Sequence, residues 1–350
     1  MDDARGSPLV SSMLGKKVKG RDDFKMKKII VITTGGTIAM KYDASTDGLI
    51  PAVSGEDLVE AVPALKNVAK VEVVEFCNVP SGYITPTAMF ELGKIVDQYA
   101  QTNEVDGIVI THGTDTLEET AYMLDLTVQT HKPVCVTGAM RGASQTSPDG
   151  PGNILAAVKT VASDEAYDQG VLVVLNDEIH AALEVTKTHA TSTKTFESPS
   201  WGPIGRVYFD AVVMKRHSLY LQKIHPDTIV DDVHLIKVVA GMDEFFFQCL
   251  IEKKAKGIVV ESFGCGNVPP AVKHGIEMAR EHNIPVVLVT RVHAGRVVTA
   301  YSYLGSASSM KESNIILAGE ISGQKARIKL MVALGMTNDV EEIRSYFAVQ

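Results

Sequence analysis

The fold is decided by the stretch IIVITTGGT at residues 29–37, in which an unbroken β-branched run leads into two glycines and a threonine. A continuous apolar run of this kind is typical of a strand buried on both faces of a parallel sheet. Similar runs recur at residues 71–74, 107–111, 133–138 and 170–175, with helix-like stretches between them. Strands that alternate with helices predict a parallel sheet with helices on both faces.

The helices expected in this first set begin with residues that are typical of helix N-termini. Residues 54–57 (SGED) place a serine before an acidic first turn, and Thr85-Pro86 places a proline at the first helical position. A third helix is expected to open at residues 115–118 (DTLE).

A second set of elements follows a stretch in which the apolar pattern weakens. Its strand-like runs are residues 235–239, 257–260, 285–289 and 315–318, and its helical stretches are residues 243–254, 270–282 and 324–334. We therefore expect a two-domain α/β protein with a larger N-terminal flavodoxin-like parallel sheet and a smaller C-terminal Rossmann-like α/β domain. The expected boundaries are a mobile N-terminal arm at 1–25, a catalytic domain at 26–214, a linker at 215–234 and a C-terminal domain at 235–350.

Composition excludes several classes of protein. The 350 residues are 45% hydrophobic and 22% charged, and acidic residues outnumber basic ones by 42 to 34, which gives a net charge of −8. An acidic chain repels phosphate backbones and anionic lipids, so neither nucleic acid nor a membrane surface is expected as a partner. No apolar run approaches the roughly 18 to 20 residues of a transmembrane helix. The four cysteines form no zinc motif and no secreted-type framework, so we expect a cytoplasmic protein without a structural metal.

Polar residues gather after four of the predicted strands, at the edge where doubly wound sheets bind ligands. They are TGGT at 34–37, NVPS at 78–81, THGTD at 111–115 and TGAMR at 137–141. The glycine pair could hold a phosphate or an oxyanion on backbone N–H groups. A P-loop would need Gly-Lys-Ser/Thr and a dinucleotide site would need G-x-G-x-x-G, and neither motif occurs. Nucleotide binding is therefore disfavoured.

Two threonines after strands, one of them beside an aspartate, suggest hydroxyl nucleophile chemistry. These are Thr37 and Thr114, the latter followed by Asp115. A threonine attacks a carbonyl only when a base takes its proton, and a partly desolvated lysine such as Lys187 could serve. The stretch around Lys187 by itself favours an ordinary surface lysine. His112 is expected to be a buried hydrogen-bonding residue rather than the base.

The chain resembles the bacterial-type asparaginase/glutaminase amidohydrolases, which are threonine amidohydrolases. TGGTIA at 34–39 and ITHGTDTLEET at 110–120 are similar to the two signature segments of that family. Further similarity runs, in order, through segments within residues 27–347. These segments are residues 137–141, 147–150, 185–187, 262–267 and 324–327.

The resemblance implies a set of catalytic roles. Thr37 is the nucleophile, Thr114 is a second catalytic hydroxyl, Lys187 is the base, and Asp115 holds the α-ammonium group of the substrate. Hydrolysis of a carboxamide needs such a nucleophile, base and clamp, together with donors for the oxyanion. No metal or organic cofactor is expected.

The resemblance also implies a substrate-binding set. Ser81 binds the α-carboxylate, and the backbone around Thr114 and Ala139 engages the side-chain amide and serves as an oxyanion hole. Gly36 belongs to the same pocket. Asn267 is contributed by the C-terminal domain of a neighbouring subunit, so we expect a homodimer or a homotetramer (a dimer of dimers) with active sites at the dimer interface.

The sequence departs from the family pattern in the lid and in the pocket. The family's lid tyrosine is missing because GYIP reads GLIP at residues 48–51, and Tyr42 is the nearest substitute. The family's Ser-Gln pair reads Ser81-Gly82, which leaves Gly82 in the substrate pocket. The acidic residue usually supplied by the neighbour has no match near residues 304–306.

The leading functional hypothesis is a cytoplasmic enzyme of asparagine catabolism. It would convert L-asparagine to L-aspartate and ammonia through a threonyl acyl-enzyme, with possible minor L-glutamine activity. One alternative is an asparaginase-like subunit of a tRNA-dependent amidotransferase, which would need an extra N-terminal barrel. The other is a catalytically inactive small-molecule binding homologue, which the joint presence of Thr37, Thr114, Asp115 and Lys187 disfavours.

Overall fold

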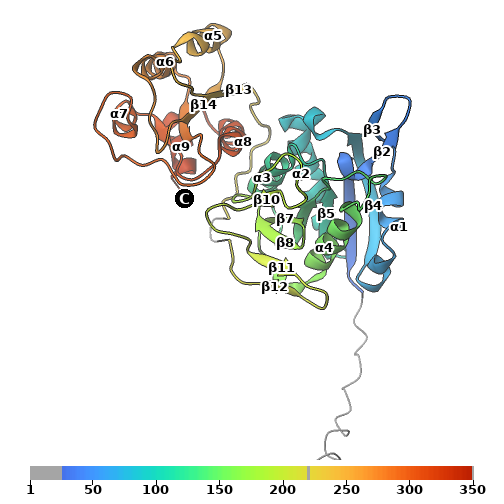
Figure 1. Ribbon diagram of the computed structural model, residues 1–350. Helices are drawn as coiled ribbons and strands as arrows, with labels where there is room; N and C mark the ends of the chain where they lie inside the picture. Colours follow the sequence, from blue (N-terminus) through green and yellow to red (C-terminus); the bar gives the residue numbers. More distant parts are fainter. Residues whose placement is uncertain (1–25, 219–220, 349–350) are drawn as a thin grey trace, which may run out of the picture.

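A parallel sheet forms the centre of the N-terminal half of the protein (Figure 1). The structure, a computed structural model, describes residues 26–218 and 221–348, and the predicted arm at 1–25 lies outside them. Five parallel strands build this centre, as the apolar runs predicted: β1 (Lys28–Gly35), β4 (Lys70–Val79), β5 (Gly107–Thr111), β6 (Val134–Thr137) and β7 (Val171–Leu175).

The strand order fixes where a ligand can bind. The parallel strands lie in the order β4-β1-β5-β6-β7, which is 2-1-3-4-5 when they are counted along the chain. This is the flavodoxin-like order, and its switch point lies between the first and third strands. The chain therefore leaves β1 and β5 in opposite directions, and a sheet of this order is expected to form its ligand crevice at that point, where Thr37 and Thr114 follow these strands.

Alternate residues of the strands support two separate cores. Ile29 and Val31 of β1 pack with residues of the helices α1 and α4, whereas Ile30 and Ile32 pack with residues of α2 and α3. The helices are α1 (Gly55–Glu60), α2 (Pro86–Ala100), α3 (Leu117–Thr127) and α4 (Gly150–Ala162). Both faces of the sheet are thus buried, which is why the β-branched run shows no polar alternation.

Two of the predicted helix starts show the expected caps. The Ser54 hydroxyl accepts the backbone N–H of Asp57 at 3.1 Å in a capping box at the start of α1. Thr85 accepts the N–H of Ala88 at 3.2 Å, with Pro86 in the first turn of α2. The third helix begins at Leu117, and its N-cap residue makes no side-chain cap bond.

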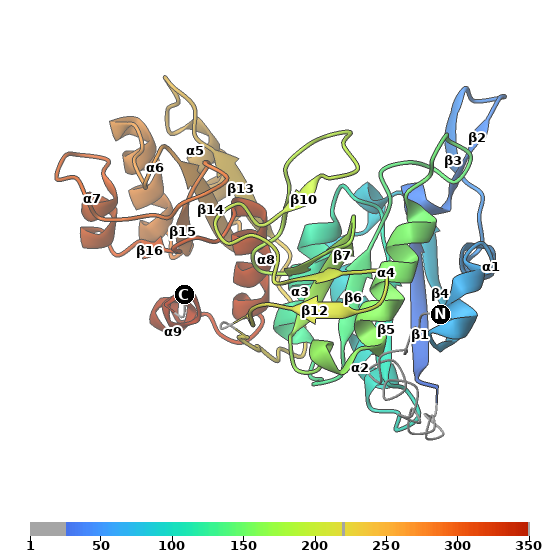
Figure 2. The same cartoon turned by 60° about the horizontal axis from the view of Figure 1, so that its bottom comes forward.

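Antiparallel strands extend the sheet in a way that the sequence analysis did not foresee. The strands β8 (Glu178–Ala181), β11 (Gly205–Val207) and β12 (Val212–Met214) add an edge beyond β7. Two small ribbons lie outside the large sheet, β2 (Met40–Asp43) with β3 (Gly48–Pro51) and β9 (Thr186–Lys187) with β10 (Phe196–Glu197). The hairpin β2–β3 projects from the side of this domain that faces away from the C-terminal half (Figures 1 and 2).

The C-terminal half has its own four-stranded parallel sheet in the order β13-β14-β15-β16. The elements are β13 (Val233–Lys237), α5 (Phe245–Lys253), β14 (Gly257–Ser262), α6 (Pro270–Glu281), β15 (Val286–Thr290), α7 (Ala307–Glu312), β16 (Ile316–Leu317), α8 (Gly323–Leu334) and α9 (Val340–Phe347). All four strands and α5, α6 and α8 lie where the apolar runs predicted them. We propose that the domains are residues 26–214 and 235–350, joined by 215–234.

The two halves pack through helices. One buried apolar cluster contains Tyr122, Met123 and Leu126 of α3 together with Ala326 and Met331 of α8. Figures 1 and 2 both show α8 beside α3. The first turn of α3 thereby brings its polar residues close to the N-terminal end of α8. Within residues 26–218 and 221–348, no helix has both the length and the apolar character of a membrane span.

Candidate active site

The turns after β1 and β5 meet backbone against backbone. Gly36 has φ 80° and ψ −176°, a conformation that is essentially restricted to glycine. A Cβ atom on Gly36 would lie 2.2 Å from Gly113 Cα, and a Cβ atom on Gly113 would lie 2.8 Å from the Ser81 Cβ. Three predicted segments therefore converge on one point, and this convergence sets Thr37, Ser81 and Thr114 around the same crevice.

Thr114, Asp115 and Lys187 form one hydrogen-bonded group. Lys187 Nζ donates to Thr114 Oγ1 at 3.0 Å and to Asp115 Oδ1 at 2.7 Å. The Lys187 side chain is 16% exposed and that of Asp115 is 79% exposed. The hydroxyl of Thr114 is thus presented to a partly desolvated amine, while the carboxylate of Asp115 reaches toward solvent where a substrate could meet it.

A buried carboxylate that sequence reasoning missed supports this group. Glu118 Oε1 accepts the backbone N–H of Lys187 at 3.2 Å and the hydroxyl of Thr186 at 3.1 Å. Its other oxygen accepts Gln324 Nε2 at 3.1 Å. Glu118 stands in the quoted signature segment, but its partners lie in distant parts of the chain. The only available signal was an acidic residue one turn after Asp115.

The backbone around Ala139 is held by hydrogen bonds to the polar side chains of Asp149 and Asn153. Asp149 accepts the backbone N–H groups of residues 140 and 141 at 3.0 and 2.9 Å. Asn153, which the sequence analysis did not single out, donates to the carbonyl oxygen of Gly138 at 2.9 Å. A Cβ atom on Gly138 would lie 3.3 Å from the Thr114 methyl group, so this segment lines the same crevice as Thr114.

His112, the residue before Gly113, is buried, as the sequence predicted. Its Nδ1 lies 2.8 Å from the Gly113 carbonyl oxygen, and its Nε2 lies 2.9 Å from Thr120 Oγ1. Burial lowers the pKa of His112 to about 4. The imidazole is therefore neutral at pH 7, with Nδ1 donating to the carbonyl and Nε2 accepting the hydroxyl.

Tyr42 is the predicted substitute for the lid tyrosine, but no hydrogen bond among the described residues links it to Thr37. Its hydroxyl donates to Asp47 at 2.7 Å within the hairpin turn, and 55% of the residue is exposed. This hydrogen bond raises the pKa of Tyr42. The bond to Asp47 holds the Tyr42 ring near the turn of the β2–β3 hairpin, so the catalytic role of Tyr42 stays a prediction.

Two further predicted site residues are Asn267 and Gly82. Asn267 lies in the turn after β14, where its N–H donates to the carbonyl oxygen of Phe263 at 3.0 Å, and its buried Oδ1 has no hydrogen-bond partner among the described residues. No hydrogen bond of the described chain joins it to Thr37 or Lys187. Gly82 is exposed, and a Cβ atom there would meet nothing within 4 Å.

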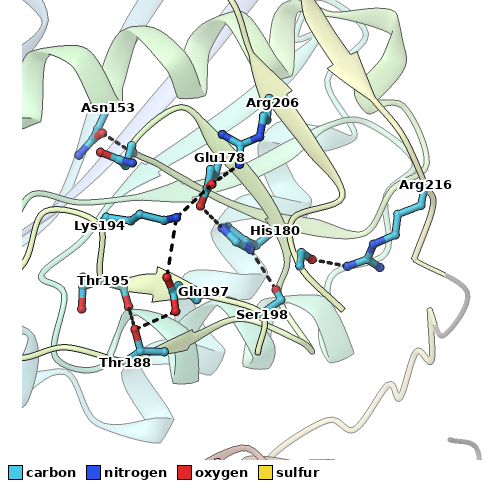
Figure 3. A network of polar contacts seen from close by, with 12 residues as sticks. Asn153, Glu178, His180, Thr188, Lys194, Thr195, Glu197, Ser198, Arg206 and Arg216 are labelled. Carbon is cyan, nitrogen blue, oxygen red and sulfur yellow. Dashed lines mark hydrogen bonds and ion pairs between the residues drawn. The ribbon is translucent and has the colours of Figure 1, made fainter. Parts of the chain in front are cut away.

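A second constellation of Ser, His and Glu includes Ser198, the residue directly after β10 (Figure 3). Ser198 Oγ lies 3.0 Å from His180 Nδ1, and Glu178 lies 3.6 Å from His180 Nε2. These residues are between 1% and 4% exposed, and burial lowers the pKa of His180 to about 4. Because a substrate cannot reach Ser198, the group is an anchor for the chain just after β10.

Candidate metal ligands do not gather in the described ranges. No cluster of three or more His, Cys, Asp or Glu side chains there could hold a metal ion. The reactive groups of the crevice are two hydroxyls, one amine and one exposed carboxylate, a set suited to acyl transfer.

Two family models together match most of the chain. The model described as Asparaginase, N-terminal, matches residues 28–220, and the Glutaminase/Asparaginase C-terminal domain model matches residues 232–347. The chain belongs to the asparaginase family.

Individual relatives align over nearly their whole length. "L-asparaginase 2" of Bacillus subtilis is 36% identical over 332 residues, covering 92% of this chain and 86% of the relative. "Glutaminase-asparaginase" of Pseudomonas fluorescens is 33% identical, covering 92% of this chain and 90% of the relative. The crystal structure of a "Probable Cytoplasmic L-asparaginase" from Campylobacter jejuni matches with a TM-score of 0.84 and 32% identity, covering 93% of this chain and 100% of that chain.

The contact between Gly36 and Gly113 yields a stability prediction. Gly36→Ala should lower the free energy of unfolding by at least about 1–3 kcal/mol, the usual cost of a non-glycine residue in such a backbone region. The overlap at 2.2 Å adds to that cost. Gly152→Ala is the matched control because Gly152 lies in α4 with open space around it, and alanine there should leave stability equal or higher. Thermal unfolding measures both, and equal midpoints for the two variants would contradict the close approach.

Proposed function

We propose that the protein hydrolyses the side-chain amide of L-asparagine to L-aspartate and ammonia, with minor activity on L-glutamine. The observation that carries the proposal is the bond of 3.0 Å from Lys187 Nζ to Thr114 Oγ1, beside the turn that holds Thr37. The names of the relatives support the same substrate, and the Pseudomonas relative supports the minor one.

The reaction proceeds by two acyl transfers. Thr37 Oγ attacks the side-chain amide carbon, its proton passes to the leaving nitrogen, and ammonia departs as a threonyl ester forms. Water then attacks the ester carbon, the bond to Thr37 Oγ breaks, and the threonine regains its proton. Lys187, bound to the second hydroxyl at Thr114, is the base that takes and returns protons during both steps.

Binding groups surround the reacting carbon. Backbone N–H groups near Thr114 and Ala139 receive the oxyanion, and their value lies in being oriented before the reaction. Asp115 holds the α-ammonium group and Ser81 holds the α-carboxylate. Gly36 and Gly82 form the parts of the pocket wall that carry no side chain.

The proposed assembly is a homodimer or a dimer of dimers, with Asn267 of one subunit completing the site of another. The buried Oδ1 of Asn267, which finds no hydrogen-bond partner in the described part of the chain, supports a role beyond its own turn. We also place the protein in the cytoplasm, because all four cysteines are free and the Campylobacter relative carries that word in its title.

Thr37→Ala tests the proposed function directly. The variant should release no ammonia from L-asparagine while its circular dichroism spectrum stays that of the wild type, because the hydroxyl forms the covalent bond. Thr37→Ser should keep partial activity, since the hydroxyl remains and only the methyl group that restricts its rotamer is lost. Wild-type turnover by Thr37→Ala would refute the assignment.

Lys187→Met tests the base. We expect kcat for ammonia release to fall by about 10² to 10⁴-fold, the usual contribution of a positioned acid or base. Lys94→Met removes an equivalent charge from the exposed surface of α2, where Lys94 pairs with Glu91, and serves as the control. If both variants keep the wild-type kcat, Lys187 is an ordinary surface lysine.

Asn267 tests the shared site. Inactive Thr37→Ala chains and inactive Asn267→Asp chains are dissociated, mixed and reassociated, and ammonia release is followed. One site of a mixed dimer carries both changes and the other carries neither, so equal mixing should leave about a quarter of the sites intact. A mixture that contains mixed dimers but recovers no activity would mean that each chain builds its own site.

A further inference from the structure

Every residue between Leu183 and Lys187 is held by a bond from another part of the chain. Lys325 Nζ donates to the carbonyl oxygens of Leu183, at 2.9 Å, and of Val185. The carboxylate of Glu184 accepts two bonds from Arg216. Glu118 then receives the hydroxyl of Thr186 and the N–H of Lys187. We call residues 183–187 the lysine segment.

Lys325 comes from the C-terminal domain. It lies on α8, is 1% exposed, and reaches across the domain interface to the lysine segment. Burial lowers the pKa of Lys325 to about 8, and the nearby Glu118 opposes that effect. A buried ammonium group is costly unless its hydrogen bonds are made, and the two carbonyl oxygens make them.

Glu118 completes the arrangement from the N-terminal domain. It lies on the first turn of α3 and is 6% exposed. Its Oε2 lies 3.9 Å from Lys325 Nζ and accepts a bond from Gln324 of α8. One carboxylate therefore joins the lysine segment on one side and the C-terminal domain on the other.

The ribbon that carries Lys187 has little support of its own. β9 and β10 have two residues each and lie outside the large sheet. The network in Figure 3 anchors the chain just after β10 through Ser198 and His180. β9, from which the Lys187 side chain reaches Thr114, is held by Glu118, and the residues just before β9 are held by Lys325.

We propose that Glu118 and Lys325 are positioning residues that fix Lys187 Nζ against Thr114, so that the C-terminal domain supports the base of its own chain. The proposal rests on the proposed function, in which Lys187 is the base. In addition to the proposed contribution of Asn267 from a neighbouring subunit, the C-terminal domain would then contribute Lys325 to the site of its own subunit.

Lys325→Met is compared with Lys329→Met. Lys329 lies one turn later on α8, is 2% exposed, and its amine lies over the Phe347 ring at 5.2 Å, away from the lysine segment. Burial lowers its pKa to about 8, as it does for Lys325. Lys325→Met should lower kcat by about 10²-fold with a smaller change in KM, because a displacement of about 1 Å costs that much. Lys329→Met should keep the wild-type kcat.

Glu118 provides a second test that does not depend on the folding of Lys325→Met. Glu118→Leu removes both acceptors and should lower kcat by a similar factor. Glu118→Gln keeps a carbonyl oxygen for the N–H of Lys187 and the hydroxyl of Thr186, and should restore most of the lost kcat. Equal losses in the leucine and glutamine variants, at unchanged unfolding midpoints, would overturn the positioning role.

A double variant separates positioning from a general structural effect. In a Lys187→Met background, Glu118→Leu and Lys325→Met should lower the residual kcat by less than about threefold, because residues that act through one group are not additive. The same large loss in that background, or a folded Lys325→Met with the kcat of Lys329→Met, would overturn the inference. If Lys187→Met keeps the wild-type kcat, the proposed base itself fails, which is a distinct result.

Discussion

The site depends on one steric constraint, the contact between the backbones of Gly36 and Gly113. The flavodoxin-like strand order sends the chain away from β1 and β5 in opposite directions, and this opens a crevice between them. The two turns close that crevice at its base so tightly that a methyl group on Gly36 would overlap Gly113. Thr37 and Thr114 each follow one of these glycines, so their hydroxyls are positioned by backbone geometry rather than by flexible side chains.

Lys187 is positioned by different means, because it lies outside the sheet. Its place is set by Glu118 and Lys325, whose side chains bind the backbone of the lysine segment, and by Gln324, which donates to Glu118. Gln324 and Lys325 both lie on α8. The apolar cluster shared by α3 and α8 therefore has a consequence for catalysis as well as for stability. Packing of Met123 and Leu126 against the C-terminal domain brings Lys325 to the lysine segment.

Sequence reasoning predicted the parts of the fold in which local pattern and tertiary environment agree. The runs at residues 29–34, 107–111 and 257–260 became buried parallel strands because both faces of each strand are covered. The antiparallel edge escaped prediction because β8 carries Glu178 and His180, polar residues whose burial depends on partners such as Arg206 and Ser198.

The same distinction applies to the candidate site. The motif segments predicted Thr37, Thr114 and Asp115 as site residues because each of them lies within a few residues of a turn that follows a strand. The role of Glu118 could not be read in this way, because Glu118 and Lys187 are 69 residues apart. Lys325 and Val185 are 140 residues apart and meet only when the domains pack.

The buried pair of Glu118 and Lys325 is hard to explain by stability alone. Two charges taken out of water lose hydration that their mutual attraction does not reliably restore, and apolar residues often replace such pairs without loss. At 3.9 Å the pair is not in close contact. Lys325 donates to carbonyl oxygens of the lysine segment, whereas Glu118 accepts from that segment through one oxygen and from Gln324 through the other. Lys329 shows that α8 tolerates a buried lysine with no acidic partner within residues 26–218 and 221–348. The arrangement is explained if the charges serve to hold the backbone around Lys187, because charge-assisted hydrogen bonds are strong enough to orient the carbonyl and N–H groups of this half-buried segment.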